Sequence, residues 1–283
     1  MAYVTEIQDK NGNTRTIQDP EANTAVGVLN TKVGALERRT RLTDFSLSTL
    51  QSAVAEQDLA KYGLKVGDQK TINGRTYIIA GLNPMKGPST PYRINANHVG
   101  LIVLPGTTQA QAWNASGKTY TGAHSHSQNA EANYEGYMNS DLHYYLENTL
   151  LPLVEGDLGS ANLYGHSKLL SNKINRTGIN KMGEATGCAS GWTWETGCKI
   201  CALSEVQVYG ATIWSSSGFD TGEACRQLDV FRVYSHTEIF GGQYPWLRDV
   251  VSASFAATAF YSGYADYDTA SYAYCVAALV LFH

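Results

Sequence analysis

The sequence predicts an α+β protein with mixed short strands, few helices and long loops. Only 16 % of its 283 residues are charged, while Gly and Tyr are abundant at 27 and 18 residues. This composition favours strands and loops over helices. Short apolar runs between turn residues recur from about Gly63 onward, as expected of short strands. A heptad-like pattern precedes them and predicts a helix near the N-terminus. The length suits one large domain with an appendage, or two domains.

The first sixty residues divide into a polar segment and a helix. Residues 1–25 are polar, carry turn signals at Asn11-Gly12 and Asp19-Pro20, and are predicted to be an attachment segment. Residues 26–60 are predicted to be an oligomerising helix, because apolar residues recur there at alternating spacings of three and four. A single helix packed on its own domain remains open, and Leu42 and Phe45, which lie off the seam, favour it. The apolar seam positions are Val26, Leu29, Val33, Leu36, Leu47, Leu50 and Val54.

Residues 63–283 are predicted to form the main domain. Gln69–Ile79 is predicted to be a hairpin, because Asn73-Gly74 is the strongest short-range signal for a two-residue turn. Ser140–Leu153 is predicted to be a helix capped by Ser140 or Asp141. The other predicted segments are a strand at Val99–Pro105, a loop at Gly106–Asn133, a buried strand running into a turn at Lys199–Tyr209, and a buried apolar strand at Val276–Phe282.

Charge and hydropathy exclude several partners. The net charge is -4 and no long basic run exists, so we expect no nucleic-acid partner. No apolar run is long enough for a transmembrane helix, and we expect no membrane insertion. The segment Met1–Ile7 lacks the basic and apolar regions of a secretory signal. A protein that acts outside the cell without such a signal is expected to leave the cell inside a virus particle released by lysis.

Few residues suggest catalysis or metal binding, and we predict no catalytic residue, metal or cofactor. His124 and His126 could supply two ligands, but a polar surface loop explains them equally. Cys188, Cys198 and Cys201 lack a fourth zinc ligand and fit a buried core. The five cysteines are scattered and odd in number, so no disulfide framework is expected.

The segment Asp249–Cys275 has the most unusual composition in the chain. It contains no Lys, Glu, Gln, Met or Trp, but five tyrosines and two phenylalanines among small residues. Antibody combining sites use the same mixture of rigid aromatic and small polar side chains. From Ala257 onward, small and larger residues alternate, which predicts one recognition face; Tyr261 and Tyr267 break the pattern and are expected at turns. Ordinary strand aromatics would also fit, but a core would need the Leu and Ile that this window lacks.

The chain from Gly63 to Phe282 resembles a known family. The segments that carry the resemblance, besides the final window, are Tyr137–Leu146, Leu203–Gly210, Trp214–Gly218 and Trp246–Asp249. They look like the C-terminal domain of variable proteins of diversity-generating retroelements. The resemblance implies a C-type-lectin-like fold in its formylglycine-generating-enzyme-like form, here preceded by a coiled-coil-like helix. The sequence departs from the family at Val276–Ala278, where an Arg and a Pro are often found.

In that family a reverse transcriptase miscopies template adenines, so AAC codons change to other codons. A changed AAC codon cannot encode Lys, Glu, Gln, Met or Trp, which are the types missing from the window. The resemblance therefore implies a variable binding face and a constant scaffold of Trp246, Leu247, Arg248 and Asp249. The expected variable residues are Ser254, Ala257, Thr258, Phe260, Tyr261, Ser262, Tyr264, Asp266, Tyr267, Asp268, Tyr272 and Tyr274.

These observations together predict a non-enzymatic receptor-binding or tail-fibre protein of a phage. Its expected partners are a bacterial surface protein or glycan at the variable face and the phage tail at the N-terminus, in a homotrimer. Three alternatives remain: a binder displayed on a bacterial surface, a calcium-dependent lectin, and an oxidase related to formylglycine-generating enzymes. The oxidase would need a reactive pair, for which Cys225 and Cys275 are the candidates.

Overall fold

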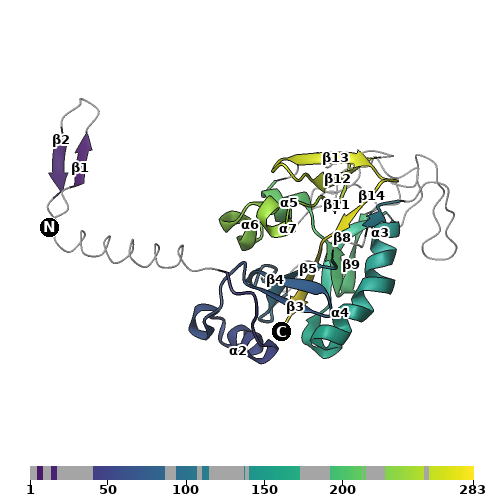
Figure 1. Ribbon diagram of the computed structural model, residues 1–283, viewed down its shortest axis with the longest axis horizontal. Coiled ribbons are helices and arrows are strands. Elements are labelled where there is room, and N and C mark those ends of the chain that lie inside the picture. Colours follow the sequence, from purple (N-terminus) through teal and green to yellow (C-terminus); the bar gives the residue numbers. More distant parts are fainter. Residues whose placement is uncertain are drawn as a thin grey trace. The chain divides into compact units, whose positions relative to one another are not determined.

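The computed structural model describes residues 5–8, 14–17, 41–86, 94–106, 110–114, 137, 140–172, 192–211, 213–214, 227–251 and 255–283 (Figure 1). It is a mixed α+β structure that divides into two units, Met1–Arg41 and Leu42–His283. In the first unit, β1 (Thr5–Gln8) and β2 (Thr14–Ile17) form an antiparallel hairpin. The second unit begins about twenty residues before the predicted domain boundary at Gly63, because the helix at Leu47–Glu56 packs into its apolar core.

The main sheet of the second unit has β15 next to its centre. Its strand order is β10-β15-β5-β4-β3, and β7 also pairs with β15. Asn73 and Gly74 both have positive φ, 49° and 80°, which confirms the predicted two-residue turn between β3 and β4. The strands are β3 (Gln69–Ile72), β4 (Arg75–Leu82), β5 (Val99–Leu104), β7 (Leu163–Tyr164), β10 (Ile200–Ala202) and β15 (Ala278–Phe282).

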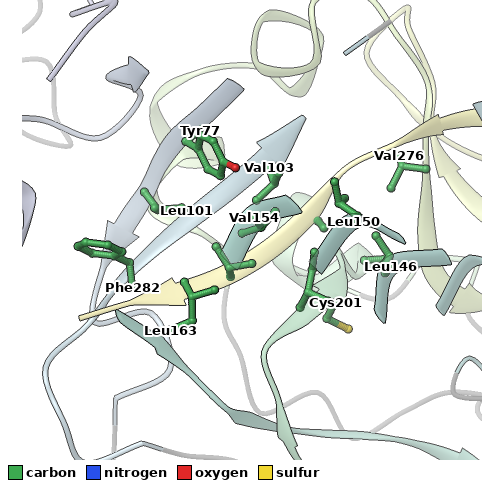
Figure 2. Close-up of a cluster of buried hydrophobic side chains, with 14 of the residues drawn as sticks. Tyr77, Leu101, Val103, Leu146, Leu150, Val154, Leu163, Cys201, Val276 and Phe282 are labelled. Carbon is green, nitrogen blue, oxygen red and sulfur yellow. The ribbon is translucent and has the colours of Figure 1, made fainter. Parts of the chain in front are cut away.

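Both faces of this sheet are buried, and β15 contributes to each. Ala278, Val280 and Phe282 point into one apolar core, whereas Leu279 and Leu281 point into the other. A strand has a period of two, so its uninterrupted apolar run serves two cores at once. This confirms the buried terminal strand that the sequence predicted. Figure 2 shows the first core, where Phe282 and Val276 lie in the same cluster as residues of β4, β5 and the long helix.

The long helix covers the first core. It begins at Ser140, whose hydroxyl accepts a hydrogen bond from the backbone N–H of His143 at 3.0 Å. Its buried apolar residues recur every four positions: Leu142, Leu146, Leu150, Val154 and Leu158. Steps of four residues drift by about 40° in an α-helix, and the wider π-helical turn at Leu146–Leu150 offsets that drift. The helix therefore continues beyond the predicted end at Leu153, through α3 (Asp141–Tyr145), the π turn and α4 (Leu151–Leu158).

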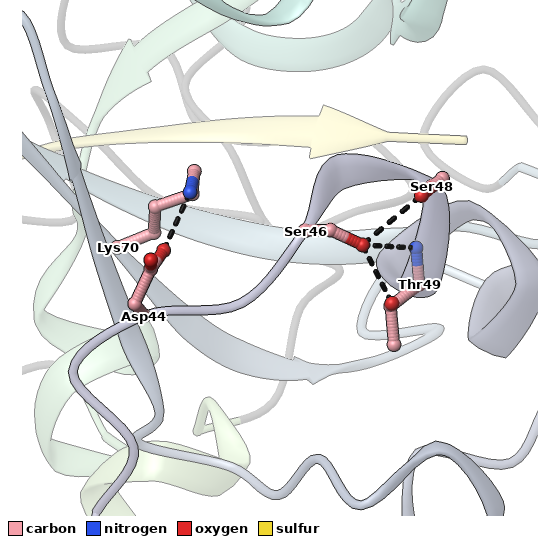
Figure 3. A network of polar contacts seen from close by, with 5 residues as sticks. All are labelled: Asp44, Ser46, Ser48, Thr49 and Lys70. Carbon is pink, nitrogen blue, oxygen red and sulfur yellow. Dashed lines mark hydrogen bonds and ion pairs between the residues drawn. The ribbon is translucent and has the colours of Figure 1, made fainter.

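The helix predicted over residues 26–60 is not continuous in its described part. Residues 41–46 are not helical, and α2 (Leu47–Glu56) starts anew at Ser46, whose Oγ accepts from the Thr49 N–H at 3.0 Å (Figure 3). Leu50 and Val54, predicted for a seam between copies, are buried in the first core. The alternative of a helix packed on its own domain is correct for α2. Residues 26–40 lie outside the described residues.

A second sheet carries the C-terminal window. Its order is β13-β12-β11-β14-β6, and Ala277 alone separates β14 from β15 of the main sheet. The described part of the predicted loop Gly106–Asn133 contains strand β6, so that prediction was incomplete. The strands are β6 (Ala110–Ala112), β11 (Pro245–Val250), β12 (Phe255–Ala259), β13 (Ala265–Thr269) and β14 (Ala273–Val276).

Three short helices cover the second core. Lys199–Tyr209 contains β10 followed by a helix rather than a turn, because Ser204 and Gln207 form a capping box. The helices are α5 (Glu205–Tyr209), α6 (Asp229–Val233) and α7 (His236–Phe240). The remaining elements are the 3-10 turns Ala60–Tyr62 and Ser160–Asn162 and a separate hairpin of β8 (His166–Asn172) and β9 (Trp192–Cys198).

A buried ion pair joins the β3–β4 hairpin to α4. Asp157 accepts two hydrogen bonds from the Arg75 guanidinium, at 2.6 and 2.7 Å, and further ones from Asn73 and the Tyr77 hydroxyl. The Asp157 side chain is 1 % exposed. Burial alone would raise the pKa of Asp157, but the hydrogen bonds from Arg75, Tyr77 and Asn73 outweigh it, and the pKa is lowered.

Replacing Asp157 with Asn should lower the free energy of unfolding by about 2 kcal/mol, because the partly buried Arg75 guanidinium would lose its counter-ion. Urea denaturation near neutral pH measures the difference. This difference in the free energy of unfolding should become smaller in acid. The contribution of Asp157 is present above the ordinary aspartate pKa of about 3.9 and is lost as the pH falls through the lower folded-state value.

The matched control is Glu56→Gln, because Glu56 pairs with Lys61 at the exposed surface. That variant should unfold almost as the wild type does, since exposed ion pairs contribute little. Equal stability of Asp157→Asn and wild type would contradict the proposed role of this pair.

Candidate ligand-binding surface

Strand β11, the middle strand of the second sheet, is held by hydrogen bonds from two buried indoles. The Trp246 Nε1–H donates to the Gln111 carbonyl at 2.9 Å, and the Trp113 Nε1–H donates to the Leu247 carbonyl at 3.0 Å. β14 lies between β11 and β6, so the two indoles hold the flanking strands around it. Trp246, Leu247, Arg248 and Asp249 are all buried, as expected of scaffold residues. Trp113 was missed in sequence because it lies in the predicted loop.

The end of β11 is tied to the connection before α5. The Arg248 N–H donates to the Leu203 carbonyl at 2.8 Å, and an Asp249 carboxylate oxygen accepts from the Glu205 N–H at 2.7 Å. The Glu205 carboxylate is itself fully buried and accepts from the N–H groups of Ile213 and Trp214 at 3.0 Å. The buried Glu205 side chain thus fixes the backbone at Trp214, whose indole is exposed.

The turn between β12 and β13 is held through its main chain. Three side chains from neighbouring helices lie within 3.2 Å of its backbone carbonyls: His236 Nε2 at Phe260, the Thr237 hydroxyl at Tyr261 and the Tyr209 hydroxyl at Tyr264. Burial lowers the pKa of His236, so the neutral ring is favoured. Gly263, with φ of 103°, supplies the conformation that other residues rarely adopt. None of these contacts depends on the side chains that the turn presents.

An aromatic ladder begins at this turn and runs across the sheet. We define it as Tyr264, Phe260, Tyr261, Tyr244, Tyr274 and Tyr272. Successive ring centroids lie 4.8, 4.5, 5.4, 5.0 and 6.4 Å apart in that order, within the usual range of aromatic pairs. Tyr261, Tyr264 and Tyr272 are 49, 54 and 53 % exposed. The ladder rests on buried Trp246, whose ring lies 4.9 Å from that of Tyr274.

Tyr274, the partly buried tyrosine next to the end of the ladder, is fixed by a carboxylate. The Tyr274 hydroxyl donates to Asp268, and burial together with this hydrogen bond raises the pKa of Tyr274. The hydroxyl therefore remains protonated near neutral pH. Tyr244 was missed because it precedes the unusual window, although a Tyr just before a scaffold Trp was a usable signal.

A second, smaller aromatic cluster involves Tyr267. Its ring contacts Trp214 at 4.7 Å and Phe255 at 5.5 Å, both edge-on. Tyr267 lies within β13 between Asp266 and Asp268, so it points to the opposite side of the strand from both. The prediction that Tyr267 marks a turn was wrong, whereas Tyr261 does lie in the turn. The alternation is therefore confined to short strands and does not define one continuous face.

The predicted variable residues divide into three groups. Tyr261, Ser262, Tyr264, Tyr267 and Tyr272 are exposed. Phe260, Asp266, Asp268 and Tyr274 are partly buried beside them.

The prediction that Ala257 and Thr258 contact a ligand was wrong, because both are buried in β12. The Thr258 hydroxyl donates to the Pro245 carbonyl at 3.0 Å, which gives it a structural role. Ser254 lies outside the described residues.

The alternative chemistries have little support in the described part of the chain. Burial raises the pKa of the Cys275 thiol to about 12, which disfavours a reactive thiolate. No group of three or more His, Cys, Asp or Glu side chains among the described residues could hold a metal ion. His124, His126, Cys188 and Cys225 lie outside the described residues. No described helix is sufficiently long and apolar to span a bilayer.

Comparisons with family models, with curated proteins and with solved structures found no match to this chain.

Thr258→Val should lower the free energy of unfolding by about 1–2 kcal/mol, because the Pro245 carbonyl would lose its buried donor. Ser262→Ala, which removes an exposed hydroxyl from the neighbouring turn, should change it by less than about 0.5 kcal/mol. Urea denaturation of both variants measures the contrast. Equal stability of Thr258→Val and wild type would contradict the structural role of Thr258, and it would then count again as an expected variable residue.

Proposed function

We propose that this protein is a non-enzymatic binding protein whose aromatic ladder recognises a ligand on a bacterial surface. The observation that carries the proposal is the support of the β12–β13 turn through backbone carbonyls. Side chains at Tyr261, Ser262 and Tyr264 can change while their positions in space stay fixed. A rigid frame with exchangeable contacts is what a diversified binding surface requires.

The residues of the ladder suit recognition. Tyrosine has few rotatable bonds, so little conformational entropy is lost when it contacts a ligand, and its hydroxyl adds a polar contact. The exposed rings of Tyr261, Tyr264 and Tyr272 would provide apolar contact area, and Asp266 would add a hydrogen-bond acceptor. A bacterial surface protein or glycan fits this combination of groups.

The finer proposal follows the resemblance to variable proteins of diversity-generating retroelements. Residues 42–283 would then adopt a C-type-lectin-like fold, with Trp246–Asp249 as constant scaffold. The N-terminal unit would attach the protein to a phage tail as part of a homotrimer in the virion. Several copies on one particle would raise the effective concentration of weak individual sites.

Display on a bacterial surface would use the same binding surface in a different location. Detection of the protein in purified phage particles supports the tail assignment, and its detection only on cell envelopes contradicts it. The variable-protein assignment has its own test in the neighbouring DNA. A near-copy of the region that encodes residues 246–282, differing at adenines and beside a reverse transcriptase gene, is expected.

Combined replacement of Tyr261, Tyr264 and Tyr272 with Ala should reduce adsorption of the purified full-length protein to host cells at least tenfold. Losing three contact rings removes more than the 1.4 kcal/mol that corresponds to a factor of ten. Fluorescently labelled protein and a panel of bacterial strains provide the measurement.

Tyr144→Ala is the matched control, because Tyr144 is similarly exposed, at 41 %, but belongs to α3. It should adsorb as the wild type does. If the triple variant, folded by circular dichroism, still adsorbs normally, the ladder is not the binding surface.

A further inference from the structure

Strand β13 lies at one edge of the second sheet. In the described part of the chain, β12 is its only partner strand (Figure 1). An edge strand exposes backbone N–H and C=O groups that can pair with a strand of another molecule. β13 also carries exposed Tyr267 and adjoins the exposed turn, so it combines an open edge with apolar side chains.

The register shows which N–H groups of β13 point outward. The Phe260 N–H donates to the Tyr264 carbonyl at 3.2 Å, so these two residues form a hydrogen-bonded pair at the turn. Hydrogen-bonded and non-hydrogen-bonded pairs alternate along an antiparallel ladder. Asp266 and Asp268, opposite Thr258 and Ala256, therefore direct their N–H groups toward β12. Ala265, Tyr267 and Thr269, opposite Ala259, Ala257 and Phe255, direct theirs away from β12, toward the outer edge.

Two of these outward N–H groups, those of Tyr267 and Thr269, already have an acceptor. An Asp266 carboxylate oxygen accepts from the Tyr267 N–H at 2.9 Å, and an Asp268 carboxylate oxygen accepts from the Thr269 N–H at 2.6 Å. Each aspartate thus occupies the donor of the residue that follows it. An incoming strand would have to displace both carboxylates before it could pair, and it would leave two charges at the new interface.

We propose that Asp266 and Asp268 cap the outer edge of β13 and prevent a second copy of this chain from adding a strand there. The second copy is the relevant occupant because it presents the same edge in the same conformation. Two such edges can pair antiparallel about a two-fold axis. This role acts on the main chain of β13 through one oxygen of each carboxylate, while the second oxygen of Asp268 accepts from the Tyr274 hydroxyl.

Sedimentation of the full-length protein tests the proposal. The variant Asp266→Ala/Asp268→Ala should exceed the wild-type mass increasingly as its concentration rises, because the outward N–H groups of Tyr267 and Thr269 lose their acceptors. Asp266→Asn/Asp268→Asn is the matched control, since the amide keeps an oxygen acceptor at the same reach but carries no charge. It should retain the wild-type mass at every concentration.

A third variant locates the contact. Adding Tyr267→Pro to the alanine variant removes the central outward N–H without loss of a bond to β12. The proline ring on the edge strand also blocks pairing, so the mass should return close to the wild-type value. Circular dichroism checks the fold of each variant. If the double alanine variant does not fold, Asp266→Ala and Asp268→Ala each expose one N–H and should associate more weakly.

Three results would overturn the proposal. One is a folded alanine variant that keeps the wild-type mass. Another is association of the asparagine variant to the same extent, which would make charge repulsion the cause. The third is association that persists after Tyr267→Pro, which would place the contact elsewhere.

Discussion

The structure depends on one continuous stretch of chain, which leaves the second sheet as β14 and enters the main sheet as β15 after Ala277. Every residue from Val276 to Phe282 is buried, and side chains from β15 enter both apolar cores. The second sheet cannot move relative to the main sheet without displacing β15, which packs into both cores. The indoles of Trp113 and Trp246 extend this restraint across β6 and β11. The exposed aromatic residues therefore stand on the most deeply buried part of the molecule.

The contacts that shape the binding surface separate conformation from side-chain identity. Tyr209, His236 and Thr237 contact carbonyl oxygens of the β12–β13 turn, and every residue type supplies a carbonyl. A turn held by its own side chains would lose its shape whenever one of them changed. Ala257 and Thr258 obey the opposite rule, because a larger side chain would overpack the interior and a lost hydroxyl would leave a buried carbonyl without a donor.

Local signals in the sequence predicted local structure well. Asn73-Gly74 determined a turn, Ser140 a helix start, and Val276–Phe282 a buried strand, because each depends on neighbouring residues. Contacts between distant segments were not predictable in this way. The spacing of Leu50 and Val54 fits a seam between copies and a core within one copy equally well. Ala257 and Thr258 were misplaced because burial depends on what packs against each face of the sheet, and composition carries no such information.

The composition of Asp249–Cys275 favours self-association through its aromatic residues and opposes it through its aspartates. Exposed aromatic rings on an edge hairpin favour self-association, and long charged side chains, a common remedy, are absent from this window. Aspartate can act at shorter range, because its carboxylate reaches the next backbone N–H while its own N–H pairs with β12. Asparagine could make the same contact with its side-chain oxygen, whereas alanine offers no acceptor. Solubility would then restrict which side chains a diversified edge can tolerate at positions 266 and 268, even where the ligand places no demand on them.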